Sequence, residues 1–138
     1  MQKYLNKVGY GNQQIGDKID MFWLDNSLKI SANEQLDFIT NLYQEDLPFD
    51  KRNINIVKNI LINQKAKTAI QAGKTGACIQ NGKVLVGWYV GYAVSDGKPY
   101  TFVTRIEKLP SDDSPKIGGW VAKRITKNIL SDLNILAQ

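Results

Sequence analysis

Residues 69–108 read AIQAGKTGACIQNGKVLVGWYVGYAVSDGKPYTFVTRIEK, and their hydrophobic side chains follow the alternating period of β-strands rather than the period of a helix. The dipeptides Asn81-Gly82 and Asp96-Gly97 are each flanked by strand-forming residues, a pattern typical of tight β-hairpins. We therefore predict a three-stranded antiparallel meander. Its strands are expected at residues 69–80, 83–95 and 98–108.

The middle predicted strand is apolar almost throughout, with VLVGWYVGY at residues 84–92, which indicates burial on both faces of the sheet. A later segment can cover one of those faces. Residues 117–134 predict a helix with hydrophobic residues four positions apart, and the segment 109–115 before it is rich in the loop-forming residues Pro, Ser and Asp. The stripe expected to lie on the sheet consists of Val121, Ile125, Ile129 and Leu133.

Two further helices are predicted within residues 31–62. Ser31 and Glu34 have the spacing of a capping box at the start of the first helix, and Asp50 is placed to cap the second. Residues 1–8 predict a third, shorter helix. The sequence thus predicts an α/β fold of the α+β kind in a single domain over residues 1–138, with helices and loops over 1–68, the sheet over 69–108 and a closing helix within 109–138.

The composition excludes several classes of protein. The 138 residues carry a net charge of +5 and include no His and one Cys. One Cys forms no internal disulfide, and without His the usual zinc ligands and the Ser-His-Asp triad are missing, so no metal and no cofactor are expected. The sequence has neither a membrane-spanning apolar run nor a signal-peptide pattern after Met1, so the chain as written is expected to be cytoplasmic.

The surplus of basic residues raises nucleic acid as a partner, because phosphate binding needs clustered Lys and Arg. The lysines are instead spread from Lys3 to Lys127, and the densest basic group, which includes Lys123 and Arg124, lies within the apolar pattern of the closing helix. We interpret this group as a solvated helix face, and nucleic acid is not expected as a partner. A basic binding module for nucleic acid or an acidic protein remains an alternative function.

The triplet Lys74-Thr75-Gly76 lies near the start of the first predicted strand and is the strongest candidate for a binding site. Alternation along a strand puts Lys74 and Gly76 on one face, so that an ammonium group stands beside a position with no Cβ where a ligand can approach the backbone. The neighbouring Ala77 N–H is a donor suited to an anionic group or a developing oxyanion. The alternative is a solvent-exposed lysine followed by a glycine bulge.

Five short motifs in order extend this pattern over nearly the whole chain. Together they resemble the later part of a class D (oxacillinase-type) serine β-lactamase, and related β-lactam sensor domains are similar. The resemblance implies a partial β-lactamase/transpeptidase-like fold, a β-lactam or peptidoglycan-like ligand, a periplasmic location for full-length members, and hydrolysis through an acyl-serine. The motifs are Tyr10-Gly11-Asn12, Phe22-Trp23-Leu24, Leu47-Pro48-Phe49, Lys74-Thr75-Gly76 and Gly87-Trp88-Tyr89-Val90-Gly91-Tyr92.

The resemblance also implies roles for single residues. Lys74 would hold the substrate carboxylate, Thr75 and Gly76 would shape the strand wall, and the Ala77 N–H would be half of the oxyanion hole. The family often has a carboxylate-binding arginine after the last strand. Arg124 is the candidate for it, with Lys123 beside it as the alternative register.

Three more motif segments are predicted around the site. Tyr10-Gly11-Asn12 would form a wall of it, or else a simple turn that ends a helix. Trp23, followed by Leu24, resembles the tryptophan that supports the family's carboxylated lysine, and the alternative is an indole in the hydrophobic core. Trp88 and Tyr92 are predicted as sheet core rather than as a ligand platform.

The sequence departs from the family at its nucleophile. A Ser-x-x-Lys pair acts from one face of a helix, where the lysine can take the serine proton. Its only match here is Ser95-Asp96-Gly97-Lys98, which spans a predicted hairpin turn, and no Ser-x-Val element occurs. We therefore expect the later half of a class D domain that is inactive alone. The alternative is activity through complementation by an N-terminal chain, and the uncovered sheet could also lead to a homo-oligomer.

Overall fold

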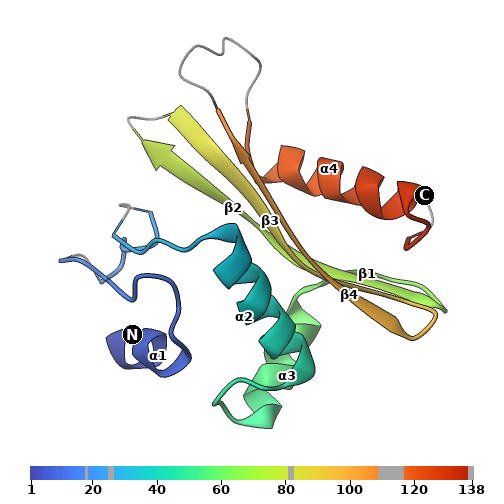
Figure 1. Ribbon diagram of the computed structural model, residues 1–138, viewed down its shortest axis with the longest axis horizontal. Coiled ribbons are helices and arrows are strands. Elements are labelled where there is room, and N and C mark those ends of the chain that lie inside the picture. The colour runs from blue at the N-terminus through green and yellow to red at the C-terminus, as the bar shows by residue number, and fades with distance from the viewer. Residues whose placement is uncertain (18, 25–26, 81–82, 109–116, 137–138) are drawn as a thin grey trace.

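Figure 1 shows the computed structural model, which describes all residues except 18, 25–26, 81–82, 109–116 and 137–138. Four strands form one antiparallel sheet in the order β1-β2-β3-β4. Helix α2 packs on one face of this sheet and helix α4 on the other. The elements are α1 (Gln2–Val8), α2 (Ala32–Gln44), α3 (Lys51–Ile60), β1 (Ile62–Lys65), β2 (Ala69–Gln80), β3 (Lys83–Ser95), β4 (Lys98–Glu107) and α4 (Gly119–Asp132).

The predicted meander is confirmed as β2, β3 and β4. Asp96 and Gly97 have positive φ angles of 48° and 77°, as a two-residue hairpin turn requires, while the predicted Asn81-Gly82 turn lies outside the described residues. The sheet also contains a fourth strand that the sequence did not predict, the short strand β1, which pairs with the start of β2. Only four residues, INQK, make up β1, and three of them are exposed, so no hydrophobic alternation marks it.

Strand β3 is buried on both faces, as predicted. Tyr89 is fully buried on the face covered by α4, and Tyr92 is only 4% exposed on the face covered by α2. The two faces follow from the register, since residues paired across β2 and β3 point to the same side. Lys74 and Val90 therefore share the α2 face, whereas Thr75 and Tyr89 share the α4 face.

The predicted helix starts are confirmed. The Ser31 hydroxyl accepts from the Glu34 N–H at 3.2 Å, and Glu34 Oε2 accepts from the Ser31 N–H at 2.8 Å, which completes the capping box of α2. Asp50 caps α3 through the Arg52 N–H. None of the described helices has the length and apolar character needed to cross a bilayer. A core of Ile39, Leu42, Leu47 and Ile54 joins α2 to α3.

The face of α4 that covers the sheet differs from the prediction. The buried residues are Gly119, Ala122, Thr126 and Leu130, whereas the predicted stripe includes Ile129 at 49% and Leu133 at 63% exposure. Compared with the prediction, α4 is rotated about its own axis by about one residue position, or about 100°. The cause is close packing, because Gly119 approaches Thr75 and the Thr126 hydroxyl lies 2.7 Å from the Thr104 hydroxyl of β4.

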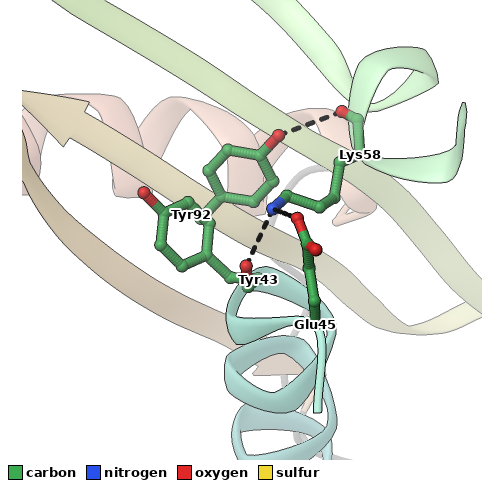
Figure 2. Close-up of polar contacts among 4 residues, drawn as sticks. All are labelled: Tyr43, Glu45, Lys58 and Tyr92. Carbon is green, nitrogen blue, oxygen red and sulfur yellow. Dashed lines mark hydrogen bonds and ion pairs between the residues drawn. The ribbon is translucent and has the colours of Figure 1, made fainter. Parts of the chain in front are cut away.

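Lys58 joins α2, α3 and β3 at one point (Figure 2). Its ammonium donates to the Tyr43 carbonyl at 2.8 Å near the C-terminus of α2 and forms an ion pair with Glu45 at 3.0 Å. The Lys58 carbonyl accepts from the Tyr92 hydroxyl at 3.0 Å, and the Tyr43 and Tyr92 rings lie 4.9 Å apart. This cluster holds the helices against the sheet.

The Lys58→Met variant tests that role. The change keeps an unbranched side chain but removes the ammonium group and leaves the Tyr43 carbonyl without this donor. We expect the free energy of unfolding to fall by about 1–2 kcal/mol, measured by urea denaturation followed by circular dichroism. The matched control is Lys51→Met on the exposed start of α3, which should change stability by less than about 0.5 kcal/mol. Equal effects of the two variants would contradict the assigned role.

Candidate functional site

The Lys74-Thr75-Gly76 triplet lies in β2 with its side chains on alternate faces, as predicted. Lys74 is exposed on the α2 face, and its ammonium donates to the Thr75 carbonyl at 2.8 Å. A Cβ added to Gly76 would meet its nearest neighbour, Trp88 Cβ, at 3.6 Å, so the backbone beside the ammonium is accessible. Thr75 points to the α4 face, where it contacts Gly119.

Strand β2 has a described neighbour on its outer edge only at its first residues. Beyond them, no described strand pairs with the backbone groups on this edge. Strand β1 pairs with β2 only between Ile70 and Ala72. The Gly73 N–H still donates to the Leu61 carbonyl outside this ladder at 2.8 Å. Hydrogen-bonding direction alternates along an antiparallel strand, so Thr75 and Ala77 also direct their N–H and C=O groups to this outer edge. The Ala77 N–H is therefore available to a ligand that lies along it.

The first turn of α4 presses on the same part of the sheet. A Cβ on Gly119 would lie 2.6 Å from Thr75 Cβ and 2.9 Å from the Gly76 carbonyl oxygen. A Cβ on Gly87 would lie 2.5 Å from the backbone of Gly118. Only glycines allow this approach. The Gly118-Gly119 pair, read together with the strand glycines, is a signal of close packing that sequence analysis missed.

The two basic candidates on α4 have different surroundings. The Lys123 ammonium lies 5.6 Å from the centre of the Tyr89 ring, and Tyr89 is the cross-strand partner of Thr75. The Arg124 guanidinium lies 5.4 Å from the centre of the Trp120 ring, which is 59% exposed. Lys123 is thus the cation nearer the strand pair that carries Thr75. A carboxylate-binding role for either residue stays a prediction.

Tyr89 also organises a polar network that the sequence did not reveal. Its hydroxyl donates to Asn63 Oδ1 of β1 at 2.8 Å and accepts from Gln71 Nε2 of β2 at 3.3 Å. Gln71 is 1% exposed, and burial raises the pKa of Tyr89 to about 12, an effect that the Gln71 hydrogen bond partly offsets. The network connects β1, β2 and β3 on the face of the sheet opposite to the Lys74 side chain.

The Tyr10-Gly11-Asn12 segment fastens a loop. The Tyr10 hydroxyl donates to Gln35 Oε1 of α2, and burial raises the Tyr10 pKa. Gly11 has a φ of +53°, and a Cβ there would lie 2.0 Å from the Lys29 carbonyl oxygen. Asn12 accepts from the Lys29 N–H at 2.9 Å and donates to the Ser27 carbonyl at 2.8 Å. The segment therefore fixes residues 27–29, and its role as a site wall stays a prediction.

Trp23 and Leu24 lie on the surface. Trp23 is 55% exposed and Leu24 is 38% exposed, whereas the adjacent Phe22 is buried at 4%. The Phe22 and Trp23 rings meet edge to face at 4.8 Å. The alternative that Trp23 is a core indole is therefore wrong, because Phe22 takes the buried position. The exposed indole is free to support a neighbouring segment, which stays a prediction.

Comparisons with known proteins agree with the fold and with the motifs. The penicillin binding protein transpeptidase domain model matches residues 1–131. A probable β-lactamase, YbxI of Bacillus subtilis (strain 168), is 38% identical over 136 residues, covering 99% of this chain and 47% of that protein. The methicillin resistance protein mecR1 of Staphylococcus aureus is 32% identical over 136 residues, covering 99% of this chain and 22% of that protein.

The solved structure of the class D β-lactamase BAT-2 superposes on this chain with a TM-score of 0.87 and 38% identity, covering 100% of this chain and 54% of that one. The chain spans about half the length of YbxI and BAT-2. The fold, the match to the family model and these relatives lead to one conclusion: the chain belongs to the penicillin-binding transpeptidase family, as a class D β-lactamase-like sequence that corresponds to the C-terminal portion of its members.

Proposed function

We propose that this chain binds β-lactams along the outer edge of β2 and does not hydrolyse them by itself. One observation carries the proposal. The Lys74 ammonium, the accessible backbone at Gly76 and the outward N–H of Ala77 converge on one strand edge that has no described strand partner there. A β-lactam has a carboxylate that suits an ammonium group and a ring carbonyl that suits a backbone N–H donor.

The lack of hydrolysis follows from the geometry of the only Ser-x-x-Lys sequence. Ser95 and Lys98 are direct cross-strand partners on either side of the hairpin turn, where Asp96 and Gly97 have positive φ angles. In a helix, side chains at i and i+3 share one face, and this lets a lysine take the proton of a serine. The extended backbone at Ser95 and Lys98 offers no such helical pair. Without a nucleophile, ligand binding remains and acyl transfer does not.

Binding and acylation are measured separately on the purified chain. We expect a fluorescent penicillin to bind reversibly by fluorescence anisotropy and to leave no mass adduct after denaturation. Lys74→Gln should weaken binding at least tenfold, because it removes the carboxylate-binding charge. The matched control, Lys67→Gln in the exposed turn between β1 and β2, should bind as the unmodified chain does.

Two results would contradict this proposal. A covalent adduct that survives denaturation would mean that the chain acylates by itself. Equal loss of binding in Lys74→Gln and Lys67→Gln would mean that only net charge matters, as expected for a nonspecific basic module.

A second candidate function is an active β-lactamase assembled with the complementary part of the class D domain. The observation that favours it is the open outer edge of β4, which ends the described sheet. Hydrolysis of a chromogenic cephalosporin by the assembled pair, and by neither part alone, would support this function.

A further inference from the structure

A polar cavity lies between the C-terminal half of α4 and the hairpin formed by β1 and β2. Its volume is about 540 Å³, which is within the range of sites for small molecules. The cavity opens on the α4 face of the sheet, whereas the Lys74 side chain lies on the α2 face, so it is separate from the proposed β-lactam site. Its polar lining consists of Gln64, Gln71, Lys127, Asn128, Ser131 and Asp132.

The floor of the cavity is the Gln71 amide. Gln71 is 1% exposed and lines the cavity from β2, and its cross-strand partner Gln64 lies on the same face of the sheet. Gln71 Nε2 donates to the Tyr89 hydroxyl at 3.3 Å, which leaves Oε1 to accept from a molecule in the cavity. A buried amide oxygen in this position favours a ligand with an N–H donor.

Two opposite charges lie at the rim of the cavity. Lys127 and Asp132 are both exposed on α4, and neither forms an ion pair with any residue that the structure describes. Asp132 is also the last residue of α4, where the helix dipole disfavours a carboxylate. A cationic ligand group beside Asp132 would neutralise this unfavourable charge.

The spacing of the two charges fits a dipeptide. Five helix positions separate Lys127 from Asp132, which is about 7.5 Å along the helix axis. A free α-amino acid carries both of its charges on one carbon, whereas an extended peptide of two residues spans about 7 Å. Its peptide group also supplies an N–H for Gln71 and a carbonyl for the Asn128 amide or the Ser131 hydroxyl.

We propose that this cavity binds a short zwitterionic peptide of dipeptide length. Its ammonium group lies at Asp132, its peptide N–H at Gln71 Oε1 and its carboxylate at Lys127. The rest of the lining suits side chains as small as that of alanine. This part consists of Ala66, Ala69 and Leu136.

Isothermal titration calorimetry of the purified chain tests the proposal, with L-alanyl-L-alanine as the probe. We expect saturable binding of one dipeptide per chain. Acetylation of the dipeptide removes its ammonium group and amidation removes its carboxylate, and each change should weaken binding roughly fivefold or more. Free alanine should bind more weakly than the dipeptide, because it is too short to reach both charges.

Variants of the chain assign each end of the dipeptide. Asp132→Asn should weaken binding of the dipeptide roughly fivefold or more and leave the weaker binding of its acetylated form unchanged. Lys127→Gln should have the same effect on the dipeptide and leave binding of the amidated form unchanged. The matched controls, Asp37→Asn on α2 and Lys51→Gln on α3, change exposed charges away from the cavity and should bind as the unmodified chain does. Circular dichroism checks that each variant is folded.

Four results would each overturn the proposal. The first is the absence of saturable binding, and the second is equal binding of the dipeptide and its two modified forms. The third is tighter binding of alanine than of the dipeptide. The fourth is an equal effect of the α4 variants and their controls, which would mean that binding depends only on the net charge of the chain.

Discussion

Replacement of Gly91 by Ala is expected to destabilise the folded chain strongly, because it forces β2 and β3 apart. A Cβ at this position would lie 2.1 Å from the Ala72 carbonyl oxygen and 2.6 Å from Gly73 Cα. Both atoms belong to the backbone of β2. This strand cannot move away from Gly91 without breaking its backbone hydrogen bonds to β3. We expect a loss of about 3 kcal/mol in the free energy of unfolding, which urea denaturation would show as a lower midpoint.

The matched control for Gly91→Ala is Gly76→Ala in the adjacent strand. A Cβ on Gly76 meets its nearest atom, Trp88 Cβ, at 3.6 Å, which is ordinary contact. The free energy of unfolding of Gly76→Ala should therefore differ from that of the unmodified chain by less than about 0.5 kcal/mol. A Gly91→Ala variant that unfolds at the same urea concentration as Gly76→Ala would show that β2 and β3 are not packed this closely.

Local signals predicted most of the fold. The Asp96-Gly97 turn and the Ser31–Glu34 capping box each depend on a few adjacent residues, and the structure confirms both. Strand β1 escaped prediction because its residues are mostly exposed and polar, and only pairing with β2 makes it a strand. Where a segment becomes a strand only by pairing with a distant part of the chain, the spacing of its hydrophobic residues does not predict the strand.

The orientation of α4 could not be predicted for a related reason. Hydrophobic spacing favoured the stripe that contains Ile125 and Ile129, because large apolar residues usually face the core. The structure buries the small residues Gly119 and Ala122 instead, since they permit close contact with β2 and β3. The stripe lies beside the buried face instead, and its residues Ile129 and Leu133 stay 49% and 63% exposed. A stripe read from sequence identifies an apolar surface without identifying what covers it.

The candidate site was predicted only in its linear part. Lys74, Gly76 and Ala77 follow from alternation along one strand, and the structure gives them that arrangement. The contact of Lys123 with Tyr89, and the bonds of Tyr89 to Asn63 and Gln71, join residues far apart in the chain. No spacing rule links them, because their proximity depends on the register of three strands.

The Tyr89 network predicts a loss of stability at alkaline pH. Burial raises the pKa of Tyr89 from its ordinary value of 10.0 to about 12, so the folded chain keeps this proton where the unfolded chain releases it. The contribution is fully present below pH 10 and is lost as the pH rises from about 10 to about 12. A shift of about two pKa units corresponds to a loss of roughly 3 kcal/mol in the free energy of unfolding.

Tyr89→Phe should flatten this pH dependence, because a phenyl ring has no proton to lose. Urea denaturation at intervals between pH 9 and pH 12 measures the slope of the unfolding free energy for both proteins. The variant starts lower by about 1 kcal/mol, since the hydrogen bonds to Asn63 and Gln71 are lost, and then declines less steeply. Tyr100→Phe, on the exposed start of β4, is the control and should follow the unmodified chain. Parallel slopes for Tyr89→Phe and the unmodified chain would mean that a group other than Tyr89 governs the alkaline transition.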